Sequence, residues 1–307
     1  MFRIIKETNI DFIGFRRKAF VLSGLLILLG LAAFFMILSG KAKMGIDFAG
    51  GTMVQGSFEN PINIADLRSA VTDGGFSEAF IQELSQYTVP NSYIIRVKET
   101  TAGEEKAVDK LTNIIAERFS DNKFTKDSEH TIGPAVGESL RKSAQWAVLI
   151  SVLGMIIYIW LRFDLRAGFA ATVATFHDVL TVLGIFFILN KEITLLVVTA
   201  LLTLAGYSLT DTVVVYDRIR ENLKKYRKKG EFVGTVNLSI NEVLSRTLMT
   251  TLSVLLVVVT LYFFGGEVLR DFALALIIGV IVGTYSSVFV ASPIVVEWEA
   301  RFPKRFK

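Results

Sequence analysis

The sequence predicts an α-helical polytopic membrane protein with six transmembrane helices and one polar α+β domain inserted between the first two. Three observations predict this class. Hydrophobic residues make up 52% of the 307 residues, a share too high for a soluble domain of this length. Six apolar stretches are each long enough to cross a membrane. Residues 40–138 hold 15 acidic against 10 basic side chains although the whole chain carries a net charge of +4, so the basic charge is concentrated beside the apolar stretches.

The first transmembrane helix is predicted at residues 19–38, an uninterrupted apolar run of 20. Three cations, Arg16–Lys18, precede this run. Ser39–Lys41 follows this run. A cleaved signal peptide would instead have a shorter apolar core with a small-x-small site after it. We therefore expect residues 1–39 to form a cytoplasmic N-terminus and an uncleaved first helix.

Residues 40–140 are predicted to fold as an extracytoplasmic domain. Alternating and helical hydrophobic periodicities indicate strands over residues 44–58, 80–84, 92–97 and 124–132 and helices over residues 62–71 and 104–119. Asn63 or Pro61 is expected near the start of the first of these helices. The resulting order, β-α-β-β-α-β, is the ferredoxin-like order.

Five further transmembrane helices are expected within residues 141–298, at residues 145–161, 168–189, 193–216, 243–264 and 272–296. Six spans place both termini in the cytoplasm. Charge agrees with this topology, because residues 217–230 carry seven basic and two acidic side chains and residues 299–307 form a basic tail. The segment after residue 216 either extends the fourth span into the cytoplasm or is a basic surface segment.

Asp211 lies within Gly206–Asn222, inside the fourth span, where an unpaired carboxylate costs several kcal/mol. Such a residue marks an ion or proton path, or else it is a helix-end carboxylate hydrogen-bonded to Ser208 or Thr212. Arg246, near the cytoplasmic end of the fifth span, has a similar depth if the two helices are antiparallel neighbours. Because a nearby guanidinium and burial act on a carboxylate in opposite directions, such a pair can bind and release a proton. The alternative for Arg246 is snorkelling to the inner headgroups.

Other polar and small residues lie inside the later spans. His177 and Asp178, in the third span, offer a second proton-relay station because imidazole titrates near neutral pH. The alternative is a structural hydrogen bond between helices, which we favour for His177. Close helix packing is the role predicted for four small residues, Gly206, Ser208, Gly279 and Gly283.

Eight short motifs occur in order along the chain. They are Gly45-Ile-Asp-Phe-Ala-Gly-Gly51, Thr131-Ile-Gly-Pro-Ala-Val-Gly137, Tyr158 to Phe163, His177-Asp178-Val179, Gly206 to Asn222, Ser245-Arg-Thr247, Phe264-Gly-Gly266 and Gly283-Thr-Tyr-Ser-Ser287. Together they resemble the SecF family, the protein-export membrane subunits of the SecD/SecF group in the RND superfamily. No single motif is specific, but this series in order is.

The resemblance implies use of the proton-motive force, with no cofactor, to assist late steps of Sec-dependent protein translocation across the bacterial cytoplasmic (inner) membrane. The first implied partner is a SecD-like six-helix subunit, which would complete the usual twelve helices. The others are the Sec channel (SecYEG), the translocating polypeptide and the lipid membrane, with accessory subunits as further candidates. The family's proton-path residues match Asp211 and Arg246, and its other essential carboxylate lies in SecD.

Other functions fit the sequence less well. A small-molecule RND-type proton-coupled exporter half would have similar spans, but one outer domain of about 100 residues is small for a porter domain. A non-transporting scaffold would use the buried charges only to fix helix register. An enzyme is least favoured, since Ser139, His130 and His177 fall in different compartments and the chain lacks cysteine and metal-spaced clusters. Lipid headgroups explain the basic segments, so we expect no nucleic-acid partner.

Overall fold

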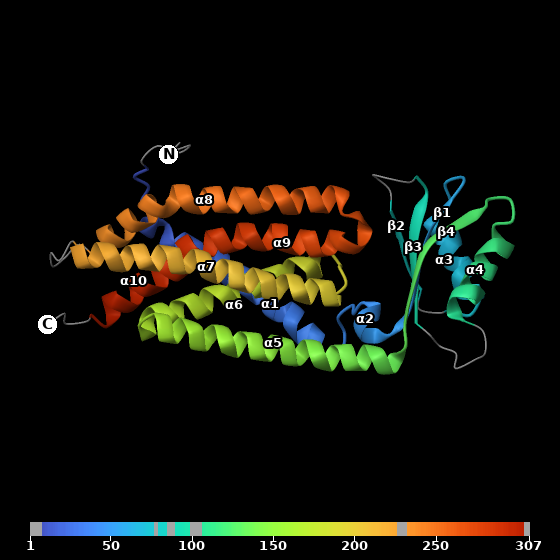
Figure 1. The fold of residues 1–307 in the computed structure, drawn as a ribbon, viewed down its shortest axis with the longest axis horizontal. Coiled ribbons are helices and arrows are strands. Elements are labelled where there is room, and N and C mark those ends of the chain that lie inside the picture. Colours follow the sequence, from blue (N-terminus) through green and yellow to red (C-terminus); the bar gives the residue numbers. More distant parts are fainter. Residues whose placement is uncertain (1–7, 77–78, 85–89, 99–105, 226–231, 304–307) are drawn as a thin grey trace. The chain divides into compact units, whose positions relative to one another are not determined.

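The computed structural model describes residues 8–76, 79–84, 90–98, 106–225 and 232–303. The chain divides into two compact units (Figure 1). The helical unit comprises Met1–Lys43, Ala147–Lys191 and Leu196–Lys307. The α+β unit comprises Met44–Trp146 together with Glu192–Leu195.

Six helices in the described part of the chain are long and apolar enough to cross a membrane, which confirms the predicted number. They are α1 (Arg16–Leu38, preceded by the short turn η1 at Ile13–Phe15), α5 (Pro134–Arg162), α6 (Leu165–Ile188), α7 (Leu195–Lys225), α8 (Phe232–Phe264) and the last span, which is built from α9 (Gly266–Ser286), η2 (Ser287–Ala291) and α10 (Ser292–Arg301).

Several helices are longer than the apolar runs that predicted them. α5 begins at Pro134 and α8 at Phe232, because polar residues continue both helices before the apolar part begins. α7 continues to Lys225, so the segment after residue 216 extends the fourth span as a helix. The end of the basic segment, residues 226–230, and the tail cations after residue 303 lie outside the described residues.

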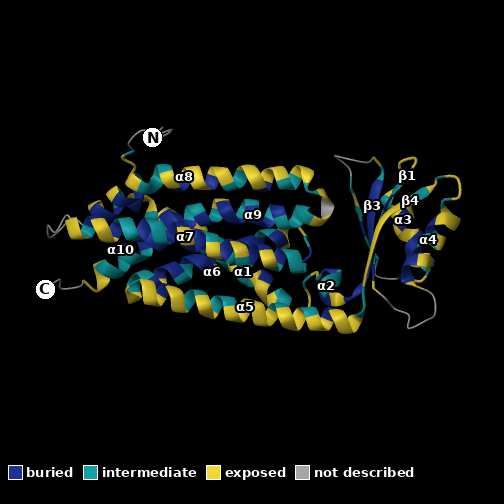
Figure 2. Cartoon of the chain, in the orientation of Figure 1, coloured by how far each residue is buried: buried dark blue, intermediate teal, exposed yellow. Residues whose placement is uncertain are grey.

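Burial separates the helices into two groups (Figure 2). α6, α7 and the last span carry most of the buried side chains, whereas few residues of α1, α5 and α8 are buried. α1 packs closely on α6 through Gly30 and Gly184: a Cβ at Gly30 would lie 2.2 Å from the carbonyl oxygen of Leu180, and one at Gly184 would lie 2.9 Å from the nitrogen of Gly30. Only residues without a side chain allow this approach.

The α+β unit contains one four-stranded sheet. Its elements are α2 (Ile46–Ala49), β1 (Gly51–Phe58), α3 (Ile64–Asp73), β2 (Phe80–Glu83), β3 (Ser92–Val97), α4 (Ala107–Arg118) and β4 (Phe124–Ile132). The strand order is β2-β3-β1-β4, and every neighbouring pair is antiparallel. α3 and α4 lie side by side against the sheet (Figure 1). The core between them contains Val54, Phe58, Leu67, Val71, Tyr93, Ile95, Leu111 and Ile115.

Most of these elements follow the sequence prediction. β3 and β4 have the predicted bounds, and the side chain of Asn63 caps α3 by accepting a hydrogen bond from the nitrogen of Ala65 at 2.9 Å. The predicted helix start at residue 104 lies outside the described residues.

The strand predicted over residues 44–58 is wrong in its first half. Residues 46–49 form the short helix α2, and β1 starts only at Gly51. Gly50 and Gly51 have φ values of 73° and 129°, which a residue with a side chain rarely adopts. These two glycines turn the chain from the helical turn into the strand.

Candidate functional site

Asp211 lies in the middle of α7 and is buried among three helices, with 8% of its surface exposed. Its Oδ1 accepts a hydrogen bond from Oγ1 of Thr247 on α8 at 3.0 Å. Its Oδ2 accepts a second one from Oγ of Ser287, the first residue of η2, at 2.7 Å. A carboxylate that accepts at both oxygens is satisfied as an anion. Asp211 therefore joins α7 to α8 and to the last span through hydrogen bonds to its two carboxylate oxygens.

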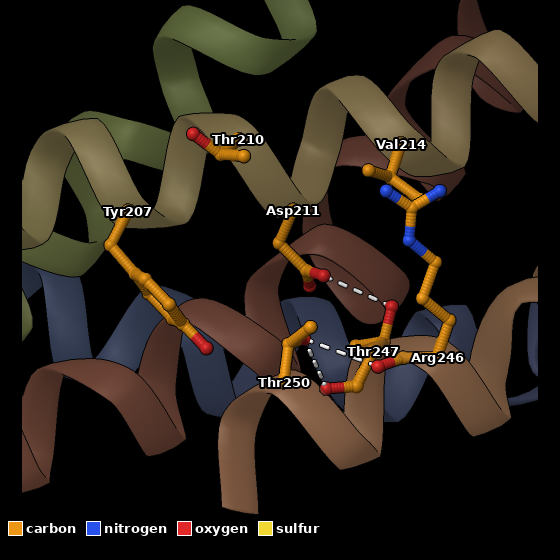
Figure 3. Close-up of a pocket in the computed structure, with 7 residues that line it drawn as sticks. All are labelled: Tyr207, Thr210, Asp211, Val214, Arg246, Thr247 and Thr250. Atoms are coloured by element: carbon orange, nitrogen blue, oxygen red, sulfur yellow. Dashed lines mark hydrogen bonds between the residues drawn. The ribbon is translucent and has the colours of Figure 1, made fainter. Parts of the chain in front are cut away.

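A recess of about 150 Å³ opens beside Asp211 (Figure 3). It is lined by Tyr207, Thr210, Asp211 and Val214 of α7 and by Arg246, Thr247 and Thr250 of α8. The recess is large enough for several water molecules, and Asp211, Arg246 and the threonines contribute polar groups to a mostly apolar lining. The carboxylate is thus buried within the protein but lies next to a place where water can reach it.

Arg246 lines the same recess but does not bind the carboxylate directly. The two side chains form none of the ion pairs found among the described residues. Arg246 shares the lining of the recess with Val214, which lies one turn along α7 from Asp211 (Figure 3). Because Arg246 is exposed on the chain surface, its charge acts on Asp211 through the recess and not through a hydrogen bond.

A second carboxylate, Asp178 of α6, is completely buried. Nδ1 of His177 lies 2.8 Å from its Oδ1, and the hydroxyl of Ser286 donates to its Oδ2 at 2.7 Å. The hydroxyl of Ser208 on α7 also donates to Oδ2. Asp178 therefore connects α6 with α7 and with the last span.

The two carboxylates share their supporting helices. Ser208, which binds Asp178, lies one turn before Asp211 on α7. Ser286, which binds Asp178, is the neighbour of Ser287, which binds Asp211. One pair of adjacent serines on the last span thus contacts both buried acids.

The last span changes its helix type at this serine pair. Ser287–Ala291 forms a π-helical segment, and the hydroxyl of Ser292 donates to the carbonyl oxygen of Ser287 at 2.9 Å. π-Helical turns contain an extra residue and occur frequently at functional sites. The irregularity coincides with the residues that bind the acids.

The predicted packing residues differ in their surroundings. A Cβ at Gly279 would lie 2.4 Å from Cδ2 of Leu204, and one at Gly283 would lie 3.2 Å from Cβ of Ser208, so α9 approaches α7 closely at both glycines. Ser208 is completely buried at this contact. Gly206 departs from the prediction: it is exposed, and a Cβ there would meet no atom within 4 Å. In the described part of the chain no helix packs on Gly206.

The structure brings Asp211 and Arg246 to one recess, but it changes the expected partners of the acid. The alternative partners, Ser208 and Thr212, do not bind Asp211. The hydroxyl of Ser208 donates to Asp178, and the hydroxyl of Thr212 donates to the backbone oxygen of Ser208 at 3.1 Å. Thr247 and Ser287 were not predicted as partners of Asp211. The signal in the sequence was that each is a hydroxyl residue at the end of a motif, Ser245-Arg-Thr247 on the fifth span and Gly283-Thr-Tyr-Ser-Ser287 on the sixth. No cluster of three metal-binding side chains was found among the described residues.

The sequence matches the family described as "Protein export membrane protein SecD/SecF, C-terminal" over residues 112–301. The chain belongs to the SecD/SecF family. It is 48% identical over 296 residues to the protein translocase subunit SecF of Thermodesulfovibrio yellowstonii, with 96% of each chain covered. It is 42% identical over 306 residues to the SecF of Endomicrobium trichonymphae, with 99% of this chain and 96% of that protein covered.

Solved structures of SecDF resemble the whole chain. One is the crystal structure of SecDF from Thermus thermophilus, described as a translocon-associated membrane protein, with a TM-score of 0.84 and 37% sequence identity over 96% of this chain. Another is SecDF in a super-membrane-facing form, with a TM-score of 0.68 and 36% identity over 98% of this chain. This chain spans 39% and 40% of those two solved chains. It therefore matches one part of each of those two longer solved chains.

Proposed function

We propose that this chain acts as a SecF-type subunit that uses the proton-motive force to assist late steps of Sec-dependent protein translocation. Membership of the SecD/SecF family over nearly the full length supports the translocation role. The single observation that carries the proton coupling is the position of Asp211. It is held between α7, α8 and the last span by two hydroxyls and lies beside a recess that contains a guanidinium.

Proton binding at Asp211 changes which side chains donate hydrogen bonds at this site. The ionised carboxylate accepts from both Thr247 and Ser287. A neutral carboxyl group carries a hydroxyl that must itself donate, so one of the two neighbours has to turn. Ser287 has an alternative acceptor, because its Oγ also lies 3.1 Å from the backbone oxygen of Thr284. In this mechanism a proton on Asp211 turns the Ser287 hydroxyl toward its own helix and replaces a charge-assisted contact between α7 and the last span by a weaker one.

Arg246 supplies a fixed positive charge at the mouth of this site. It stays protonated throughout the cycle because a guanidinium does not lose its proton in proteins. Its charge attracts the ionised form of Asp211 across the recess and repels a second cation. The role of Arg246 in this proposal is electrostatic and needs no direct contact with the acid.

Asp178 and His177 form the second station of the proposed relay. Ser286 can donate to Asp178 at 2.7 Å or to the backbone oxygen of Gly283 at 3.1 Å, the same choice that Ser287 has. Because Ser286 and Ser287 are adjacent, a change of acceptor by one hydroxyl when its acid binds a proton also shifts the hydroxyl that binds the other acid. His177 contacts Asp178 within α6, whereas the hydrogen bond between helices that the sequence favoured for His177 is not seen among the described residues.

A six-helix SecD-like chain is the proposed partner. Large apolar side chains are exposed along α1, α5 and α8 of this chain. Some of them face lipid, and a second set of helices would cover others together with the exposed Arg246. The solved SecDF chains, which are more than twice as long as the part matched here, contain enough sequence for such a second half. The Sec channel and the translocating polypeptide are the further partners.

The α+β unit is proposed to be a ferredoxin-like, extracytoplasmic domain with a mechanical or binding role and no catalytic one. The element order βαββαβ and the antiparallel strand order β2-β3-β1-β4 support the ferredoxin-like assignment. The acidic balance of residues 40–138 supports the outer side of a bacterial cytoplasmic membrane, with both termini inside. The proton gradient supplies the energy, and no cofactor is required.

Asp211→Asn tests this function. The amide keeps the size of the side chain but cannot gain or lose a proton, so proton-dependent export should be abolished while the chain still assembles with its partner. Glu221→Gln is the matched control, because Glu221 is a carboxylate on the exposed face of the same helix. Export is measured in cells that depend on the plasmid-borne variant, with and without an uncoupler. Normal uncoupler-sensitive export in Asp211→Asn would refute the proposal.

A further inference from the structure

The proton site does not explain the motif Gly45-Ile-Asp-Phe-Ala-Gly-Gly51, which lies in the α+β unit. This Gly45–Gly51 segment packs against residues 192–195, a short stretch that belongs to the same compact unit. Residues 192–195 directly precede α7 in the chain and end at its first residue, Leu195. The contacts of the segment therefore determine how the start of α7 is held.

Gly45 makes the first of these contacts. Its nitrogen donates to the carbonyl oxygen of Ile193 at 3.0 Å, next to a parallel β-bridge between Met44 and Ile193. A Cβ at Gly45 would lie 2.7 Å from Cγ2 of Thr194. A larger residue would have to displace the methyl group of Thr194, so with threonine at position 194 glycine is the residue that allows the two backbones to pair closely.

Asp47 makes the second contact and reaches the helix itself. Its Oδ2 accepts a hydrogen bond from the nitrogen of Leu195 at 2.9 Å. The first N–H groups of a helix have no acceptor within the helix. A carboxylate at this end is also attracted by the positive end of the helix dipole. Asp47 thus caps α7 from a segment almost 150 positions earlier in the chain.

An ion pair makes the third contact. Nη1 of Arg96, on β3, lies 2.8 Å from Oε2 of Glu192. The two side chains are only 19% and 10% exposed, so solvent screens this pair much less than a surface pair. Removing either partner would take away the ion-pair partner of a largely buried charge. The sheet of the α+β unit is therefore bound to the residues just before α7.

The same segment also supports the first turn of α5. Gly50 lies against this turn: a Cβ there would be 3.2 Å from Cα of Pro134. A Cβ at Gly137 would be 3.0 Å from the nitrogen of Gly50. The second motif of the sequence, residues 131–137, thus contacts the first motif directly. One short segment holds the starts of two transmembrane helices.

We propose that the Gly45–Gly51 segment couples the α+β unit to the proton-binding helix, with Asp47 as the positioning residue that keeps the start of α7 fixed to that unit. The inference rests on the proton-driven function proposed above. Asp211 follows Leu195 on the same continuous helix by about 24 Å at 1.5 Å per residue. A displacement of α7 caused by proton binding at Asp211 is carried along this helix to its capped end and pulls on the segment.

The first test compares two substitutions of Asp47 in the full-length chain with its partner. Asp47→Ala removes the acceptor, and we expect proton-dependent export to fall about fivefold, the equivalent of a single helix cap of ~1 kcal/mol. Asp47→Asn keeps a side-chain oxygen and should stay within about twofold of the wild type. If Asp47→Ala does not accumulate, Leu195→Pro removes the donor instead, because proline is tolerated at the first position of a helix; it should reduce export in the same way.

The second test restores the connection by a covalent bond. The chain contains no cysteine, so a disulfide forms only between introduced residues. A Cβ at Gly45 would lie 3.4 Å from Cβ of Thr194, close to the usual separation in a disulfide. We expect Gly45→Cys with Thr194→Cys to restore export to the Asp47→Ala chain under oxidising conditions and to lose this effect on reduction.

A control disulfide separates coupling from simple stabilisation. Thr52 and Thr131 face each other across β1 and β4, with their hydroxyl oxygens 3.2 Å apart. Cysteines at these positions cross-link the α+β unit without binding residues 192–195, so they should not restore export. Equal rescue by both disulfides would overturn the proposal. Normal export in Asp47→Ala alongside defective Asp211→Asn would overturn the coupling alone, whereas normal export in Asp211→Asn would refute the proton-driven function itself.

Discussion

Ser287→Ala should destabilise the protein by an amount that depends on the charge of residue 211. The substitution removes one of the two hydroxyls that donate to Asp211. A hydrogen bond to a charged group contributes about 1.5–3 kcal/mol, and one between neutral groups about 0.5–1.5 kcal/mol. In an Asp211→Asn chain the amide nitrogen can donate to Ser287, and Ser287 can donate to Thr284. We therefore expect Ser287→Ala to cost about 2 kcal/mol in the wild type and about 1 kcal/mol in Asp211→Asn.

A double-mutant cycle on the purified complex measures this difference. For a chain of this size 1 kcal/mol corresponds to a change in Tm of roughly 2–4 °C, so the coupling is resolvable by thermal unfolding. Ser253→Ala is the matched control, because Ser253 is an exposed serine on α8 that donates only to a backbone oxygen of its own helix. It should change stability by less than about 0.5 kcal/mol in both backgrounds. An identical cost of Ser287→Ala with aspartate and with asparagine at position 211 would refute the charge-assisted contact.

Three further predictions concern packing and charge. Arg96→Glu and Glu192→Arg should each lower the unfolding free energy by about 3–5 kcal/mol, and the double reversal should recover most of it; no recovery in thermal unfolding would argue against a specific pair. Gly283→Val should lower stability by about 1–3 kcal/mol while Gly206→Val leaves it nearly unchanged, and the reverse order would contradict the packing described here. Arg246→Lys should keep uncoupler-sensitive export within about twofold because the charge remains, whereas Arg246→Gln should abolish it; equal activity of both variants would exclude an electrostatic role.

The transmembrane architecture could be predicted because its rules are local. Each span has to be long and apolar by itself, so the sequence within one window is sufficient to find it. The polar turns that open α5 and α8 carry no such signal, since a helix outside the hydrocarbon layer needs no apolar run. Residues 46–49 were misassigned for a related reason: two successive glycines at positive φ, and not the hydrophobic pattern, decide where β1 begins.

The candidate site could be predicted only in part. Asp211 and Arg246 are recognisable because charges are costly inside a membrane. Their hydrogen-bond partners depend on which helices lie side by side and on how far each is rotated, and a single sequence does not encode this visibly. Thr247 and Ser287 come from positions 36 and 76 residues away from Asp211. The same reason explains the two glycines: Gly206 and Gly283 are the same residue type, but of the two only Gly283 faces another helix in the described part of the chain.

The π-helical segment at Ser287–Ala291 gives the last span two separately oriented halves. One additional residue in a turn rotates everything after it by about 100° relative to a regular α-helix. The face on which Ser286 and Ser287 reach Asp178 and Asp211 therefore does not continue into α10. The hydroxyl of Ser292 donates to the carbonyl oxygen of Ser287 in the wider turn. Such a turn can move along a helix by exchanging one hydrogen bond at each end. A change in this turn near the buried acids would therefore rotate α10 relative to α9 without bending the helix.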